Sequence, residues 1–216
     1  NDTITSGGGD NYIHGGTGSD TVDYSYLTGA DFGEDTDNVA YYKNGIYYDG
    51  IKVDLTNSSA QRIHTNYGTD TILNIENVIG STKSDYIVGN DENNILDGKG
   101  GNDYFVLGKG TDTILGDIGN DTIAFSDAGR NGTTIGGVIV DLSKNQTYGS
   151  LDTYRVINDG FGKAKYLDSI ENVIGTSSVD IIIGNDKDNK LEAGANADTL
   201  YGGKGADTLV GGSGAD

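Results

Sequence analysis

Residues 98–124 read GKGGNDYFV, LGKGTDTIL and GDIGNDTIA, three consecutive nonapeptides that share one pattern of residue types. Position six of each nonapeptide is Asp, and position eight is Phe105, Ile114 or Ile123. Glycine recurs at positions one, two and four, where it allows positive φ and lets backbone carbonyl groups approach a common point. Positions seven to nine alternate, so one apolar side chain points inward from a short strand. This period of nine residues predicts a solenoid of turns and short strands.

The same frame runs through three arrays, residues 1–23, 80–124 and 175–216. Position six is Asp or Asn in all of them, and position eight is aliphatic or Phe. Two nonapeptides make one coil of eighteen residues, so turns eighteen residues apart are expected to stack on the same side of a parallel, two-sheet roll. Glycine interrupts every stretch that could form a helix, and we therefore expect an all-β fold.

Two inserts, residues 24–79 and 125–174, separate the arrays. The phrases V-D-L and I-E-N-V-I-G recur in both, at 53–55 and 75–80 in the first insert and at 140–142 and 170–175 in the second. The second phrase returns to the nonapeptide frame with Glu at position six and Val at position eight. We therefore expect two tandem units in one continuous repeat region, in which each phrase adds a strand to the roll.

The first insert also contains VAYYKNGIYY at residues 39–48, where Asn44–Gly45 lies between two β-prone runs. This pattern predicts a β-hairpin. Seven of the 14 tyrosines fall in this insert: Tyr24, Tyr26, Tyr41, Tyr42, Tyr47, Tyr48 and Tyr67. We expect them to pack the hairpin onto the roll; the alternative is an exposed aromatic platform for a sugar or a partner protein.

The composition excludes several classes of function. The chain has no Cys and 2 His, which excludes a disulfide framework, a thiolate zinc site and a three-histidine catalytic zinc. Its net charge of −19 argues against nucleic acid or an anionic membrane as a partner, and no apolar run is long enough to span a bilayer. The motifs H-E-x-x-H, G-x-S-x-G and G-x-x-x-x-G-K-[ST] are absent, so we expect a protein that is not an enzyme.

The nonapeptide G-G-x-G-x-D-x-U-x resembles the repeat of the RTX, or hemolysin-type calcium-binding, family. The resemblance implies a right-handed parallel β-roll with several Ca²⁺ ions between its stacked turns. It also implies type I secretion, folding outside the cell, and a secreted, extracellular or cell-surface location. Ca²⁺ takes six to eight oxygen ligands, and stacked turns offer position-six oxygens together with backbone carbonyls.

The candidate calcium ligands follow from this frame. At position six they are Asp2, Asp20, Asp85, Asn94, Asp103, Asp112, Asp121, Asp180, Asn189, Asp198, Asp207 and Asp216. The accompanying glycines are Gly16, Gly18, Gly101, Gly110, Gly119, Gly203, Gly205 and Gly214. Glu76 and Glu171 precede the second and third arrays, as edge ligands or capping groups or as solvated side chains. The turns at 80–85 and 175–180 lack two of the three glycines, so we expect no full sites there, and up to about seven ions in the chain.

These observations favour a calcium-binding β-roll module of a secreted bacterial protein. At a net charge of −19 the calcium-free chain repels itself and is expected to stay disordered, so that calcium binding supplies the folding free energy. Its role would be a structural or adhesin-type spacer, or a secretion-linked repeat region, beside neighbouring repeats of a longer chain. The alternative is a carbohydrate-binding repeat module attached to a secreted polysaccharide-modifying enzyme, with a glycan or a surface partner.

Overall fold

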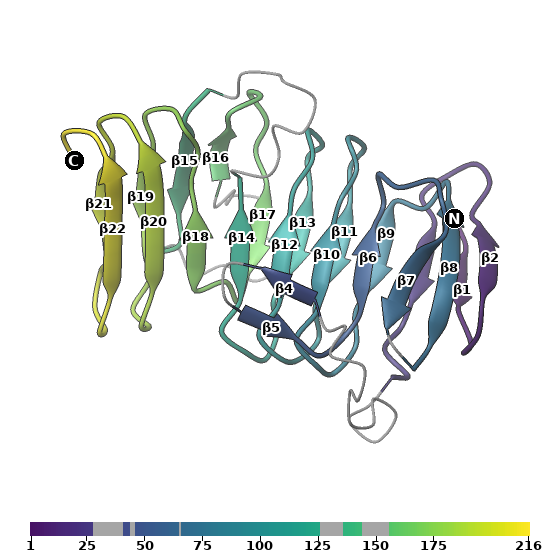
Figure 1. The fold of residues 1–216 in the computed structure, drawn as a ribbon. Coiled ribbons are helices and arrows are strands. Elements are labelled where there is room, and N and C mark those ends of the chain that lie inside the picture. Colours follow the sequence, from purple (N-terminus) through teal and green to yellow (C-terminus); the bar gives the residue numbers. More distant parts are fainter. Residues whose placement is uncertain (28–40, 44–45, 65, 126–135, 144–155) are drawn as a thin grey trace.

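The structure is a computed structural model that describes residues 1–27, 41–43, 46–64, 66–125, 136–143 and 156–216. Every regular element within these ranges is a β-strand, and most strands are three residues long. Positions seven to nine of a nonapeptide supply one such strand, as in β12 (Tyr104–Val106) and β13 (Thr113–Leu115). The short strands stack side by side along one axis to form a roll, with the two chain ends at its opposite ends (Figure 1).

Two long sheets form most of the roll. The first sheet contains, in order, β1 (Thr3–Thr5), β3 (Thr21–Asp23), β9 (Asn77–Ile79), β11 (Ile95–Asp97), β13 and β17 (Tyr166–Asp168). The second contains β6 (Lys52–Asp54), β10 (Tyr86–Val88), β12, β14 (Thr122–Ala124), β18 (Asn172–Ile174), β20 (Lys190–Ala195) and β22 (Thr208–Ser213). Successive strands of the second array alternate between the two sheets, as a coil of two nonapeptides requires.

Three smaller sheets complete the described structure. One contains β16 (Val156–Asp159), β15 (Val138–Asp141), β19 (Ile181–Ile183) and β21 (Thr199–Tyr201). Another contains β2 (Asn11–His14), β8 (Gly68–Leu73) and β7 (Gln61–His64). The last is the hairpin of β4 (Tyr41–Lys43) and β5 (Ile46–Tyr48).

The register within the arrays is eighteen residues. Phe105 pairs with Ile87 on one side and with Ile123 on the other, and all the ladders within the second array are parallel. These position-eight side chains lie between the sheets and are fully buried. Each contributes roughly 1.5–3 kcal/mol by leaving water. The all-β fold and the parallel β-roll expected from the repeats are confirmed.

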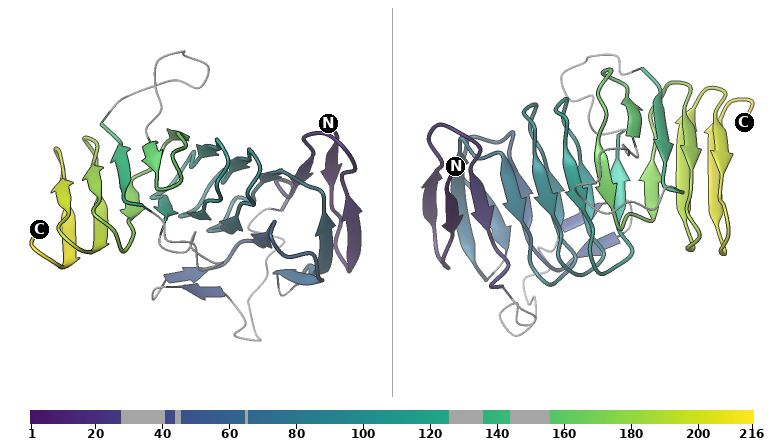
Figure 2. Two further views of the ribbon diagram at one scale, coloured as in Figure 1. Left: turned by 90° about the horizontal axis from the view of Figure 1, so that it is seen from above. Right: turned by 180° about the vertical axis from the view of Figure 1, so that it is seen from behind.

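Each insert leaves one face of the roll uninterrupted. Val22 pairs directly with Val78 across the first insert, and Ile123 pairs with Val173 across the second. On the opposite face, the V-D-L strand of each insert adds one strand to the sheet: β6 pairs in parallel with β10, and β15 pairs in parallel with β19. The expectation that both phrases add strands to the roll is confirmed. The hairpin of the first insert and the strands β15 and β16 of the second insert lie on opposite sides of the roll, as the view from above shows (Figure 2).

The predicted hairpin is present as β4 and β5, which pair antiparallel; its turn residues, Asn44 and Gly45, lie outside the described ranges. Tyr48 packs on the outer surface of the second sheet against Tyr86 and Tyr104, with ring centroids 5.9 and 5.8 Å away. All three rings are buried. Tyr48 thus fastens the hairpin to the roll. Tyr24 lies in the core, where its hydroxyl donates to Asp70 at 2.8 Å.

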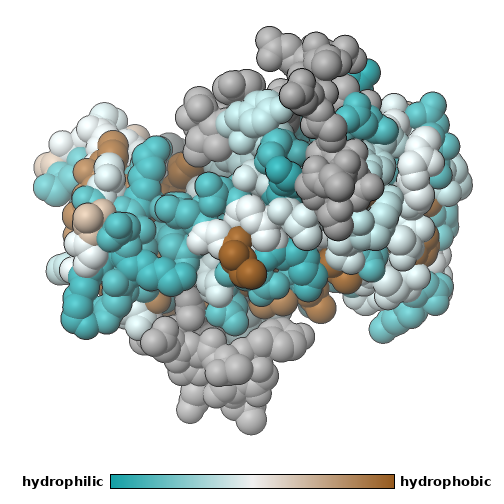
Figure 3. All heavy atoms as spheres, turned by 90° about the horizontal axis from the view of Figure 1, so that it is seen from below, coloured by the Kyte–Doolittle hydropathy of each residue, from teal (hydrophilic) through white to brown (hydrophobic). Residues whose placement is uncertain are grey.

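The outer surface of the roll is largely polar. Seen from below, it is mainly hydrophilic, with apolar side chains scattered in small groups (Figure 3). Within the described ranges, no helix has the length and apolar character needed to cross a membrane.

Candidate calcium sites

Hydrogen bonds join the position-six residues into columns along the two edges of the roll. The backbone N–H of Asp85 donates to Asp103 Oδ1 at 2.8 Å, and the N–H of Asp103 donates to Asp121 Oδ1 at 2.8 Å. The same contact joins Asp2 to Asp20, Asn94 to Asp112, Asp180 to Asp198, Asn189 to Asp207 and Asp198 to Asp216. The structure therefore brings together the residues that the eighteen-residue spacing predicted to stack.

Four of these carboxylates keep one buried oxygen without a hydrogen-bond partner. The oxygens are Oδ2 of Asp20, Asp103, Asp121 and Asp198. Those of Asp20, Asp103 and Asp121 lie near the first glycine of their own turns. A Cβ on Gly98 would collide with Asp103 Oδ2, and one on Gly116 would collide with Asp121 Oδ2. Buried anionic oxygens without donors are costly unless a cation compensates them, so these four positions fit a metal ion that accepts hard oxygen ligands.

The turn glycines bring backbone oxygens close to these columns. Gly101 has φ 111°, a conformation that L side chains rarely adopt. The predicted glycines Gly16, Gly18, Gly203 and Gly205 also have positive φ. Gly119 is required for a different reason, because a Cβ there would collide with the carbonyl oxygen of Gly101 one coil earlier. Gly110 and Gly214 are similarly close to the carbonyls of Glu92 and Asn196.

Without a cation nearby, burial disfavours the ionised form of these carboxylates. It raises the pKa of Asp121 to about 7, and the charge of Glu171 adds to this effect. Burial also raises the pKa of Asp103, and the neighbouring charge of Asp85 acts in the same direction. A divalent cation between the turns would stabilise the ionised forms, since metal binding is favoured by deprotonated ligands.

The glycine-poor turns satisfy their carboxylates in another way. Asp85 accepts hydrogen bonds from the N–H and hydroxyl of Ser81 and from the N–H of Ile51, at 2.6, 2.7 and 2.7 Å. Asp180 accepts the same set from Thr176 and from Val138 N–H, at 2.6, 2.9 and 2.7 Å. A hydroxyl at position two and the start of a V-D-L strand thus supply the donors. This agrees with the expectation that the two turns form no full sites.

The two asparagines at position six close their turns by hydrogen bonds. Asn94 accepts from the N–H of Asn90 at 2.9 Å, and its amide donates to the Glu76 carbonyl at 2.7 Å. Asn189 makes the equivalent contacts with Asn185 and the Glu171 carbonyl, at 2.8 and 2.8 Å. The NH₂ group cannot ligate a cation, and the amide oxygen, which could, already accepts an N–H of its own turn. These asparagines therefore serve their columns as hydrogen-bonding groups, with Asn at position two as the sequence signal.

Glu76 and Glu171 continue the columns across the inserts. Glu76 Oε2 accepts the N–H of Asp20 at 2.9 Å, and Glu171 Oε2 accepts the N–H of Asp121 at 3.0 Å. Glu171 is buried and also pairs with Lys187 at 2.6 Å. Each glutamate thus accepts the backbone N–H that a position-six carboxylate accepts elsewhere in the column; whether it also serves as an edge ligand stays a prediction.

Sequence reasoning missed Lys165, which lies in the second insert and has a fully buried side chain. Its Nζ lies 2.8 Å from Oδ2 of Asp112, a predicted calcium ligand. Asp112 is thus satisfied by an ammonium group. The sequence does not indicate this contact, because the position of Lys165 depends on how β17 pairs with β13.

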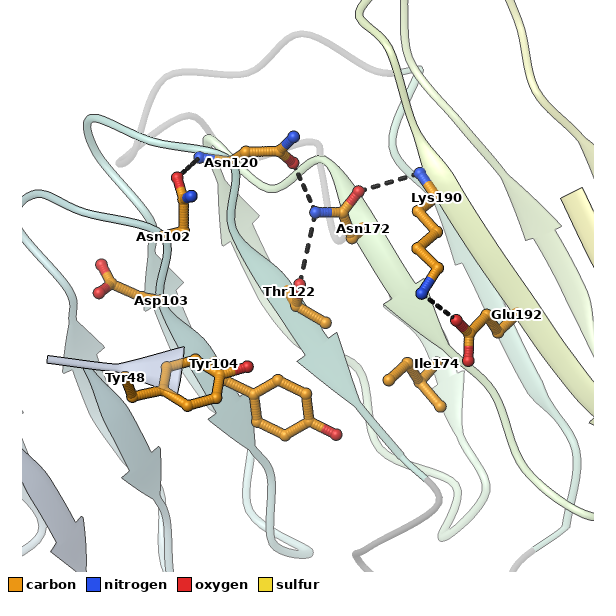
Figure 4. A pocket seen from close by; sticks show the side chains of 10 residues that line it. All are labelled: Tyr48, Asn102, Asp103, Tyr104, Asn120, Thr122, Asn172, Ile174, Lys190 and Glu192. Carbon is orange, nitrogen blue, oxygen red and sulfur yellow. Dashed lines mark hydrogen bonds and ion pairs between the residues drawn. The ribbon is translucent and has the colours of Figure 1, made fainter. Parts of the chain in front are cut away.

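A pocket of about 310 Å³ lies on the outside of the second sheet, beside Tyr48 and Tyr104 (Figure 4). A polar row crosses it: Asn120 N–H donates to Asn102 at 3.0 Å, Asn172 bonds to Asn120, and Lys190 N–H donates to Asn172 at 2.9 Å. These contacts tie neighbouring coils together on the outside, as the position-six columns do at the edges.

Among the described residues, no three His, Asp or Glu side chains gather closely enough to hold a metal by themselves. Any ion here would need backbone carbonyls as well, because each turn contributes one position-six carboxylate.

Comparison with protein families gives one match, to the RTX calcium-binding nonapeptide repeat (four copies). It covers residues 1–24, 75–105, 88–123, 174–209 and 183–216, more than half of the chain. No curated protein matches the chain in a sequence search.

Proposed function

The chain belongs to the RTX calcium-binding nonapeptide repeat family, and we propose that it is a calcium-folded structural module of a secreted protein. Calcium ions would lie between stacked turns at the edges of the roll. Their ligands would be turn carbonyls and the carboxylates that have an unpartnered buried oxygen, those of Asp20, Asp103, Asp121 and Asp198. These four oxygens are the observation that carries the proposal.

Charge gives the module its calcium dependence. The chain carries a net charge of −19, and part of that charge is placed in buried columns. Without calcium, these columns repel each other in a medium of low dielectric constant, and folding is opposed. Each bound ion adds two positive charges, so its binding free energy contributes directly to folding.

This dependence suits a spacer or adhesin-type segment that is exported unfolded and folds in calcium-rich surroundings outside the cell. Extracellular modules commonly bind calcium at millimolar levels, which matches such a route. The carbohydrate-binding alternative gains no support from Tyr24 or Tyr48, since both rings are buried in packing contacts.

The test is a calcium titration of the wild-type chain and of Asp121→Asn, followed by far-UV circular dichroism and by the number of bound ions. We expect the wild type to gain β structure with calcium, and Asp121→Asn to bind fewer ions and to need more calcium. Glu92→Gln is the matched control, because it removes one exposed carboxylate outside the columns. A wild-type spectrum that is identical in chelator and in millimolar calcium would contradict the proposal.

A further inference from the structure

Lys165 places a positive charge inside the roll, where four oxygens surround it. Its Nζ lies 2.8 Å from the carbonyl oxygen of Gly108, 2.7 Å from that of Gly110 and 2.8 Å from Asp112 Oδ2. The fourth oxygen is Asp159 Oδ2, at 3.0 Å. The side chains of Lys165, Asp112 and Asp159 are all about 1% exposed. A lysine so deeply buried is rare unless it is paired.

The four oxygens are of the kind that bind calcium. Gly108, Gly110 and Asp112 are positions two, four and six of the nonapeptide at 107–115. A glycine-rich turn therefore points two carbonyls and its position-six carboxylate at one place. Asp159 completes the set from β16; its Oδ1 accepts the N–H groups of Phe161 and Lys163 at 2.9 and 2.8 Å, which fixes its orientation. Carbonyls and carboxylates are the hard oxygen ligands that Ca²⁺ prefers.

The corresponding place at the first insert is also filled by a nitrogen of the chain. There β8 pairs with β2 as β17 pairs with β13, and Asn11 lies opposite Asp70. Asn11 Nδ2 donates to the carbonyls of Gly7 and Gly9, both at 3.0 Å, and to Asp70 Oδ1 at 2.9 Å. Gly7 and Gly9 are again positions two and four of their turn.

Both junctions pair a nitrogen donor with a carboxylate, but the two groups are exchanged between position six and the inserted strand. In the first, position six carries the nitrogen and the inserted strand carries the carboxylate. In the second, position six carries the carboxylate, at Asp112, and the inserted strand carries the nitrogen, at Lys165. A donor group on the turn carbonyls is thus a shared feature of both insert junctions.

We propose that the Lys165 ammonium is a tethered cation that takes the place of a calcium ion at turn 107–112, so that the second insert joins the roll without metal. The inference rests on the proposed function, since it assumes that the other glycine-rich turns hold calcium with the same oxygens. Lys165 then excludes turn 107–112 from the calcium sites. Asp112 is a partner of Lys165 and not a metal ligand.

The charges predict what happens when the ammonium is removed. Two buried carboxylates face one positive charge in the wild type. Lys165→Met keeps an unbranched side chain of similar length but leaves both carboxylates and both carbonyls without a cation. In limiting calcium the variant should therefore be less stable than the wild type. In saturating calcium, the vacated place should accept one ion, and much of the lost stability should return.

The experiment measures bound calcium per chain and the thermal midpoint, in limiting and in saturating calcium, for three variants. We expect Lys165→Met to bind one more ion than the wild type and to show a larger calcium-induced rise in its midpoint. Lys163→Met, an exposed lysine of the same loop, should match the wild type. The double variant Lys165→Met/Asp112→Asn should lose the additional ion.

Three results would overturn the inference. The first is an unchanged ion count in Lys165→Met when the wild type binds calcium; it leaves the proposed function standing. The second is a failure of Lys165→Met to fold even in saturating calcium, because the metal should replace the ammonium. The third is an additional ion that persists in the double variant. A wild type that binds no calcium would overturn both this inference and the proposed function.

Discussion

Position two of a nonapeptide decides how the buried side chain at position six is satisfied. The hydroxyls of Ser81 and Thr176 donate to their own Asp, and the side-chain oxygen of Asn90 accepts from the amide of its own Asn. Where position two is Lys99 or Asp117, the side chain makes no such bond within the turn, and the carboxylate oxygen stays unpartnered. One residue type thus separates closed turns from turns that fit a cation.

Two neighbouring carboxylates should respond differently to truncation. Asp103→Ala removes an unpartnered oxygen and should lower the number of bound ions and raise the calcium concentration needed for folding. Asp85→Ala leaves the donors of Ser81 and Ile51 unpaired, which costs about 1–3 kcal/mol, but should leave the ion count unchanged. Calorimetric titration of both variants checks this. Equal ion loss would show that Asp85 is also a ligand.

Acid should stabilise the calcium-free roll. Asp121 has a folded-state pKa of about 7, above the value of about 3.9 in an unfolded chain. The folded chain therefore binds more protons, and this contribution is fully present below about pH 4 and lost as the pH rises through about 7. In chelator, the far-UV signal of β structure should therefore be larger at about pH 5 than at about pH 8.

Calcium should weaken or reverse this pH dependence, since it favours the ionised carboxylates. Far-UV circular dichroism across this pH range, with and without calcium, measures both effects. A calcium-free β signal that falls on acidification would contradict the assignment of buried, unneutralised carboxylates.

At the scale of the strands, the second sheet shows how an insert is fastened. The rings of Tyr86 and Tyr104 stack 5.3 Å apart on its outer surface, one coil from each other, and Tyr48 covers both. An apolar ladder that would otherwise face water is thereby buried under β5. The hairpin is therefore part of the packing of the roll as well as an addition to it.

Truncation of the hairpin's anchor should affect stability and not metal binding. Tyr48→Ala removes a buried ring and should cost about 3 kcal/mol. The ion count should stay the same, because the columns lie at the edges of the roll. Tyr47→Ala, at a neighbouring ring that is 39% exposed, is the control and should cost less. Denaturant unfolding in saturating calcium measures the difference; a loss of bound ions in Tyr48→Ala would place the hairpin in the calcium sites.

The strands that could be predicted from sequence are those with a strict period. The position-eight side chains Ile87, Phe105 and Ile123 recur every eighteen residues, so their pairing follows from counting. Strands β7 and β16 could not be predicted in this way, because their antiparallel pairing depends on contacts across the inserts. For the same reason the period identified Asp112 but not Lys165, whose role arises from a pairing between residues 53 apart.

At the scale of the whole molecule, each insert adds strands on one face of the roll and leaves the ladder on the other face continuous. The first insert adds β6 beside β10, and the second adds β15 beside β19. The pairs β3–β9 and β14–β18 continue the hydrogen-bonded ladder across the first and the second insert. Each array therefore contacts the next through one unbroken ladder. In stacked repeats, such nearest-neighbour contacts decide how far cooperativity extends.

We expect this continuity to give the three arrays one calcium-dependent transition, or two coupled ones. Far-UV circular dichroism reports all the strands, whereas the near-UV signal comes mainly from the buried tyrosine rings, which among the described residues are Tyr24, Tyr48, Tyr86 and Tyr104 and include none from the third array. The two signals should change together in a calcium titration of the wild type. Val173→Ala removes fully buried methyl groups from the ladder between the second and third arrays, and should separate the transitions and shift the third array to higher calcium.

Leu209→Ala is the control, because Leu209 lies in β22 and is 47% exposed, whereas Val173 is fully buried. It should lower stability slightly and leave the two signals coincident. Signals that already separate in the wild type would show that the inserts divide the roll into independently folding parts. Coincident signals in Val173→Ala would show instead that the arrays are coupled mainly through the shared electrostatics of their carboxylate columns, and that the ladder is not what transmits the transition.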